Sequence, residues 1–121
     1  VDFNKYFTAD KPVIFNFHGS PETLKPLLIG QKNPERFSVR GYIENGSTTT
    51  PFDMQVRNET SRFHLAIEAM RLLAARGRVA EKKSAFLIKE LEKKLRAHAA
   101  YIKKHGVDPE EIENWQWKGK S

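Results

Sequence analysis

Two short apolar segments, separated by about the length of one helix and its connections, place the strongest constraint on the fold of this chain. The first, PVIFNF at residues 12–17, is apolar almost throughout, which is typical of a central strand buried on both faces. The second, FSVRGY at residues 37–42, also has a strand-like pattern. Between them, Ser20 and Pro21 offer an N-cap and a first helical position for a short helix ending at Gly30. This order predicts a right-handed βαβ unit with parallel strands.

The second half of the chain is predicted to be helical. Thr50 is a suitable N-cap, Pro51 suits the first helical position, and Asp53 is placed to help cap the helix. Apolar residues then recur mostly at three- or four-residue steps until Gly77, although the polar residues 58–61 interrupt the pattern. We therefore expect a helix from Pro51 that is kinked or divided at this polar segment.

A second long helix is predicted over residues 79–105. Apolar residues repeat along one of its faces, and His105 and Gly106 provide the signal for its end. A further short helical turn is expected at residues 108–111. With the two strands, these helices indicate an α/β fold in which helices dominate the second half.

Most of the net charge of +6 lies in this second long helix. Residues 79–105 contain eight Lys and Arg but only three Glu, so the rest of the chain is nearly neutral. A basic helix can bind nucleic acid or another anionic surface. Here the acidic residues are interleaved with the basic ones, which favours a solvated helix face. A small nucleic-acid-binding module is the alternative function.

Length and composition indicate one domain without cysteine chemistry. A chain of 121 residues suits a single domain with a modest core, so we treat residues 1–121 as one domain. The absence of cysteine excludes a disulfide and a Cys nucleophile, and it favours a reducing, cytoplasmic location. The first residues lack the pattern of a secretory signal, and no segment is long and apolar enough to cross a membrane.

A threonine-rich turn before Pro51 is the most prominent candidate binding site. Asn45 and Gly46 predict a tight turn, and three consecutive threonines follow it just ahead of the helix. Hydroxyl groups, free helix N–H groups and nearby cations can hold an anion, such as a regulatory phosphate ligand, or contact another protein surface. A plain ordered turn is the alternative. The candidate residues for an anion or inter-domain contact are Arg40, Thr48, Thr49, Thr50, Arg57 and His64. Of these, His64 is expected to have a packing or interface role.

The four histidines do not have the spacing of a metal site. No two of them are four residues apart, as a helical zinc site requires. His18 follows the first strand at a position where α/β sheets often place ligands, but a structural hydrogen bond to nearby backbone is favoured. For His98 and His105, an interaction with the helix dipole near the helix end explains their positions.

Several separated motifs closely resemble the C-terminal domain of phosphoketolases. Members of this family are thiamine-diphosphate enzymes that split xylulose 5-phosphate or fructose 6-phosphate with inorganic phosphate, giving acetyl phosphate and an aldose phosphate. The motifs cover nearly the whole chain in the family's order: FTADKPVIFNFHG at residues 7–19, VRGY at 39–42, TTTPFDM at 48–54, RFHL at 62–65, YIKKHG at 101–106 and EEIENWQW at 110–117.

The resemblance implies a partial three-layer α/β sandwich, like the C-terminal domain of transketolase, with a small, mostly parallel sheet and two long helices. Further strands would lie upstream, and the N-terminal and middle domains would bind thiamine diphosphate with Mg²⁺ or Ca²⁺. The chain has no GDG triplet of the kind that commonly helps to hold this cofactor's metal, so we assign it no catalytic, cofactor-binding or metal residue. The resemblance also implies a homodimeric parent enzyme and a C-terminal part that is inactive alone.

The sequence ends in an aromatic pair that needs a surface to cover it. Trp115 and Trp117 lie beside acidic residues, which makes stacking on nucleic-acid bases a poor explanation. Packing of the pair back on the helices is favoured. Docking on another domain or subunit is the alternative.

Overall fold

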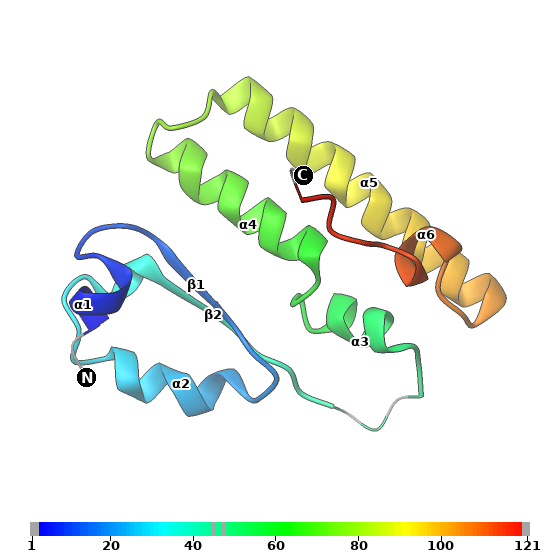
Figure 1. The fold of residues 1–121 in the computed structure, drawn as a ribbon, viewed down its shortest axis with the longest axis horizontal. Helices are drawn as coiled ribbons and strands as arrows, with labels where there is room; N and C mark the ends of the chain where they lie inside the picture. The colour runs from blue at the N-terminus through cyan, green and yellow to red at the C-terminus, as the bar shows by residue number, and fades with distance from the viewer. Residues whose placement is uncertain (1–2, 45, 47, 120–121) are drawn as a thin grey trace.

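The computed structural model describes residues 3–44, 46 and 48–119, and it confirms the expected partial α/β fold (Figure 1). The elements in these residues are α1 (Phe3–Phe7), β1 (Val13–Asn16), α2 (Pro21–Leu28), the 3-10 turn η1 (Pro34–Arg36), β2 (Phe37–Arg40), α3 (Pro51–Arg57), α4 (Arg62–Ala75), α5 (Glu81–His105) and α6 (Glu110–Glu113). Asn45, half of the predicted tight turn, lies outside the described residues. Its neighbour Gly46 has a φ of 74°, as a turn glycine can adopt.

β1 and β2 form a parallel pair, as predicted. Val13 lies opposite Phe37, and Asn16 lies opposite Arg40. The expectation that β1 is a central, fully buried strand is wrong for the part of the chain described. There, only β2 pairs with β1, and the β1 side chains are partly buried or exposed. A strand with one open edge cannot be as buried as an internal one.

The two faces of this small sheet have different neighbours. On one face, β1 and β2 pack against α1 and α2 around an apolar core, whose members are Phe7, Val13, Phe15, Leu28, Phe37 and Val39. On the other face, Ser38 and Arg40 reach α4, where both contact Glu68 at 3.0 Å. The sheet therefore lies between two helical layers, as Figure 1 shows.

An arginine fixes the N-terminal segment to this sheet. Arg36 is buried, and its guanidinium group donates to the carbonyl oxygens of Phe7, Thr8 and Lys11 at 3.1, 2.9 and 2.7 Å. Neither α1 nor this role was predicted from the sequence. Three backbone acceptors for one buried cation explain why the segment before β1 is held in place.

The crossover helix α2 begins where the sequence predicted it and ends slightly earlier. Pro21 is its first residue, and Ser20 is at the N-cap position without a side-chain capping bond among the described residues. Close to this helix start, the backbone of Gly41 approaches Gly19 and Pro21, and Tyr42 N–H donates to the Gly19 carbonyl at 2.7 Å. A side chain at residue 41 would therefore have no space.

The polar segment at residues 58–61 divides the predicted helix into α3 and α4. Glu59 adopts a φ of 57°, and Ser61 starts α4 by accepting a hydrogen bond from His64 N–H at 3.3 Å. Helix α4 ends at Ala75, ahead of Gly77, whose φ of 69° confirms the predicted stop. Local capping chemistry thus separates two helices where the apolar pattern alone predicts one.

α4 and α5 run side by side in opposite directions and make the second helical layer (Figure 1). α5 matches the predicted long helix and ends at His105. Gly106 caps it with a φ of 68° and donates to the Ile102 carbonyl at 2.8 Å. Within the described ranges, no helix is both long and apolar enough to cross a membrane.

Candidate functional site

The predicted N-cap threonine belongs to a hydrogen-bonded network that joins the start of α3 to His98 of α5 and to Asp108 after that helix. Thr50 Oγ1 accepts a hydrogen bond from Asp53 N–H at 3.1 Å, which confirms the capping role. The same hydroxyl donates to Asp108 Oδ1 at 2.9 Å. One hydroxyl therefore caps a helix and bonds to a residue distant in the sequence.

Asp53 is the buried anion at the centre of this network. Its Oδ2 atom accepts hydrogen bonds from Thr49 Oγ1 at 2.7 Å and from Arg57 Nε at 2.8 Å. Its other oxygen, Oδ1, lies 3.9 Å from His98 Nδ1. Asp53 thus does more than cap α3, because its carboxylate accepts hydrogen bonds from a hydroxyl and a guanidinium group. It also lies near the His98 imidazole, whose buried Nδ1 atom makes no hydrogen bond with the described residues.

His98 lies between two carboxylates, and the dipole explanation for this residue is wrong. Only 3% of His98 is exposed, and its Nε2 atom lies 2.9 Å from Asp108 Oδ1. Helix α5 continues for seven further residues to His105, so burial and the aspartates dominate over the helix end. We refer to Thr50, Asp53, His98 and Asp108 as the histidine network.

The sequence contained a signal for this buried histidine. His98 falls at the three- and four-residue steps that also contain Leu91, Leu95 and Ile102, so it belongs to the apolar face of α5. The neighbouring Ala99 is exposed. A polar residue on an apolar stripe requires a buried hydrogen-bond partner.

Two of the predicted site residues lie in a different cluster. Arg40 donates to Glu59 Oε2 at 3.2 Å and to Glu68 Oε2 at 3.0 Å. His64 Nδ1 lies 2.8 Å from Ser61 Oγ. Burial lowers the pKa of His64 below its usual value, Glu59 partly opposes this effect, and Arg40 adds to it. The candidate residues therefore form two groups, one at the N-terminus of α3 and one at the N-terminus of α4.

A cavity of about 380 Å³ lies beside the threonine loop, which we define as residues 48–50. Tyr42, Glu44 and Met54 also line this cavity, whereas Arg40, Arg57 and His64 do not. Thr48 is exposed, but Thr49 and Thr50 already bond to aspartates. Hydrogen bonds to Asp53 and Asp108 therefore order the threonine loop. That the loop binds an anion or another domain stays a prediction.

Trp115 of the C-terminal aromatic pair contacts α4 through Arg62. Arg62 lies over the Trp115 ring at 4.7 Å and also over Phe52 and Phe63. Burial lowers the pKa of Arg62, and the nearby Glu111 opposes this effect. Trp117 packs edge-on against Trp115 but is 80% exposed. Packing on the helices therefore covers about half of Trp115, which is 48% exposed, and leaves most of Trp117 uncovered.

His18 packs against an aromatic side chain. His18 is exposed at the end of β1, where its ring stacks on Tyr42 with 4.2 Å between centroids. In the residues that the structure describes, no three His, Asp or Glu side chains are grouped as metal ligands. What these features define is an α/β module whose polar side chains chiefly join its own helices and loops.

Comparison with known proteins identifies the family. The family model described as XFP C-terminal domain matches residues 1–117. The chain is 46% identical to a "Probable phosphoketolase" of Brucella abortus, with 96% of the chain and 14% of the relative covered. It is 41% identical to the "Xylulose-5-phosphate phosphoketolase" of Lactiplantibacillus pentosus, with 98% of the chain and 14% of the relative covered. The chain belongs to the XFP C-terminal domain family of phosphoketolases.

The chain corresponds to a small part of each of these relatives. The chain spans 14% of the length of each curated relative described above. The relatives are phosphoketolases and give no support to the nucleic-acid alternative. The charged residues of α5 are mostly exposed around the helix, in agreement with a solvated face.

Proposed function

We propose that this chain is the C-terminal structural and interaction portion of a phosphoketolase. The family match over residues 1–117 carries this proposal. The parent enzyme would convert xylulose 5-phosphate or fructose 6-phosphate, with phosphate, to acetyl phosphate and an aldose phosphate. Residues 1–121 would then be one part of the C-terminal domain, and further strands from the same polypeptide would complete its sheet.

The chemistry of this reaction would come from thiamine diphosphate with Mg²⁺ or Ca²⁺ in the N-terminal and middle domains. A divalent cation of this type needs several oxygen ligands. In the described part of this chain, Asp53 and Asp108 are engaged by hydroxyl, guanidinium and imidazole groups, and no group of three potential ligands is present. These residues do not fit the metal site, so we derive no reaction step from them.

The residues of this chain would instead provide an ordered contact surface. The histidine network joins the start of α3, the last part of α5 and the turn before α6. It thereby fixes the threonine loop, whose Thr48 stays exposed. We propose that this loop, with Arg57, contacts another domain or a regulatory anion, and that Arg40 and His64 stabilise the neighbouring start of α4.

Assembly and location complete the proposal. Among the described strands, β1 has one open edge, and open edges are normally paired or covered in a native assembly. The N-terminal and middle domains are the first partners that we propose, within a cytoplasmic homodimer. The exposed Trp117 is a further contact point for another domain or subunit.

Acetyl phosphate formation tests the proposed reaction. The full-length polypeptide that contains this chain would be incubated with xylulose 5-phosphate, phosphate, thiamine diphosphate and Mg²⁺, and acetyl phosphate would be measured as its hydroxamate. We expect formation that depends on both phosphate and ketose phosphate. The purified 121-residue chain under the same conditions should form none. Absence of product from the full-length enzyme with either ketose phosphate would reject the proposed activity.

A further inference from the structure

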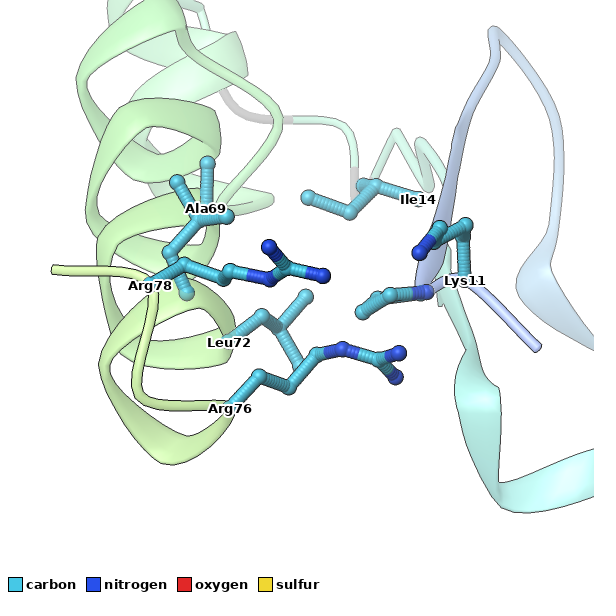
Figure 2. Close-up of a pocket in the computed structure, with 8 residues that line it drawn as sticks. Lys11, Ile14, Ala69, Leu72, Arg76 and Arg78 are labelled. Atoms are coloured by element: carbon cyan, nitrogen blue, oxygen red, sulfur yellow. The ribbon is translucent and has the colours of Figure 1, made fainter.

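A groove between β1 and α4 has an apolar floor and a cationic rim. Its volume is about 600 Å³, which lies within the range of specific binding sites. Ile14 of β1 faces Leu72 and Leu73 of α4 across the groove. Figure 2 shows that the side chains of Arg76 and Arg78 extend from the end of α4 toward β1. Neither the histidine network nor the threonine loop contributes to this groove.

The cations of the groove are poorly neutralised. Lys11, Arg76 and Arg78 line it, and Asp10 is the nearby anion. Asp10 Oδ2 lies at the long distances of 3.8 Å from Lys11 and 3.9 Å from Arg76, and the Arg76 guanidinium group also donates a hydrogen bond to the Asp10 carbonyl oxygen at 2.9 Å. No ion pair of Arg78 is present among the residues described. Three cations around one apolar cavity repel each other, so an acidic group placed there would be stabilised.

The position of the groove also favours a polypeptide partner. Residues on the β1 side of the sheet line it, including Pro12 and Ile14, whereas no residue of β2 does. β1 pairs with β2 along one edge, and the parallel pattern leaves alternate N–H and C=O groups pointing away from that partner. An incoming segment can therefore use backbone groups, apolar side chains and carboxylates together.

We propose that the groove binds an acidic, partly apolar segment of the same phosphoketolase polypeptide, whose carboxylates pair with Arg76 and Arg78. This inference rests on the proposed function. The chain spans only 14% of its relatives' length, so most of a phosphoketolase polypeptide is available as the partner. Guanidinium groups suit this partner because they bind carboxylates in a bidentate manner.

Two other occupants are less compatible with the groove. A second copy of this chain would bring an identical set of cations to a symmetric contact, and like charges would then face each other. A small free anion would satisfy the arginines but leave the apolar floor formed with Ile14, Leu72 and Leu73 in water. An acidic segment with apolar side chains satisfies both parts of the groove.

Site-specific photocrosslinking in the full-length enzyme tests the proposal. Leu73, which lines the groove and is 36% exposed, would be replaced by p-benzoylphenylalanine. We expect irradiation to give a crosslink within one polypeptide, and peptide mapping should place it in a segment outside residues 1–121 that contains Asp or Glu. The same replacement at Phe86, on the exposed surface of α5, is the matched control and should not give this crosslink.

Charge reversal adds a second readout. Arg78→Glu should reduce the Leu73 crosslink and lower the unfolding temperature of the full-length enzyme. Arg71→Glu is the control, because Arg71 is also on α4 but lies outside the groove, and it makes an exposed 3.7 Å pair with Glu92. Equal effects of the two reversals would overturn the proposal.

The crosslinked product distinguishes the occupants. A product of doubled mass on a denaturing gel would show a second copy in the groove and overturn the proposal. Absence of any crosslink, with the probe's ketone photoreduced, would show an open groove or a small ligand and would also overturn it. Acetyl phosphate formation measured on the same preparation separates failure of this inference from failure of the proposed function.

Discussion

His98 Nε2 of α5 lies 2.9 Å from Asp108 Oδ1, an oxygen that also accepts a hydrogen bond from the N-cap residue Thr50. This contact connects the C-terminal part of the chain to the loop before α3. The imidazole is 3% exposed, so its interactions are shielded from water. A buried polar side chain of this kind stabilises a structure only when its partners are present.

Removal of this imidazole should therefore destabilise the chain. We expect His98→Ala to lower the free energy of unfolding by about 1–3 kcal/mol, because Asp108 would lose a buried hydrogen-bond partner. Urea unfolding followed by circular dichroism measures this change. His105→Ala is the control, since His105 is exposed and should change stability by no more than about 0.5 kcal/mol. Equal losses in the two variants would contradict a structural role specific to His98.

The N-cap of α3 gives a second prediction. Thr50→Ala removes the acceptor for Asp53 N–H and the donor to Asp108, and it should cost about 1 kcal/mol or more. Thr48→Ala changes an exposed threonine of the same loop and should have little effect on unfolding. Urea unfolding midpoints compare the two variants. If Thr48→Ala were the more damaging substitution, the assigned hydrogen bonds would be wrong.

The close approach of two loops makes Gly41 sensitive to any side chain. A Cβ atom there would overlap the Gly19 carbonyl and the Pro21 ring, which are backbone or rigid groups. We expect Gly41→Ala to destabilise the chain by about 1–3 kcal/mol through overpacking. Gly30→Ala is the control, since a Cβ at Gly30 meets no atom within 4 Å. Equal unfolding temperatures for the two variants would contradict the close approach at Gly41.

Local signals explain what the sequence predicted well. Thr50 marks the start of α3 and Gly106 the end of α5 through contacts with residues a few positions away, so their roles follow from short sequence patterns. The parallel pairing of the two strands followed from their spacing across one helix. Such features need little knowledge of the rest of the fold.

The features that the sequence did not predict depend on long-range contacts. Arg36 binds carbonyl groups at residues 7, 8 and 11, and His98 meets Asp53 from a different helix. Neither partner set is visible from spacing in the sequence. The N-terminal helix α1 and the division of the candidate residues into two clusters depend on such contacts, because the tertiary arrangement decides which polar groups meet.

His64 gives a prediction for the dependence of stability on pH. Burial lowers its pKa in the folded chain, so the folded state binds fewer protons at this residue than the unfolded state, whose reference pKa is 6.5. The contribution of the neutral imidazole is therefore complete above this pH and is lost as the pH falls below it. Urea unfolding from pH about 8 to about 5 should show a larger loss for the natural chain than for His64→Gln. An equal loss in both would indicate that His64 does not contribute.

The most direct test of the central claim is acetyl phosphate formation by the full-length phosphoketolase beside a version that ends just before Val1, with the dimer content of both measured by analytical ultracentrifugation. We expect the full-length enzyme to form acetyl phosphate and the shortened version to lose this activity, with or without loss of the dimer. Loss of activity in an intact dimer would mean that this chain shapes the catalytic domains, whereas loss of both would mean that it holds the assembly together. Unchanged activity and assembly without residues 1–121 would contradict the structural and interaction role proposed for the chain.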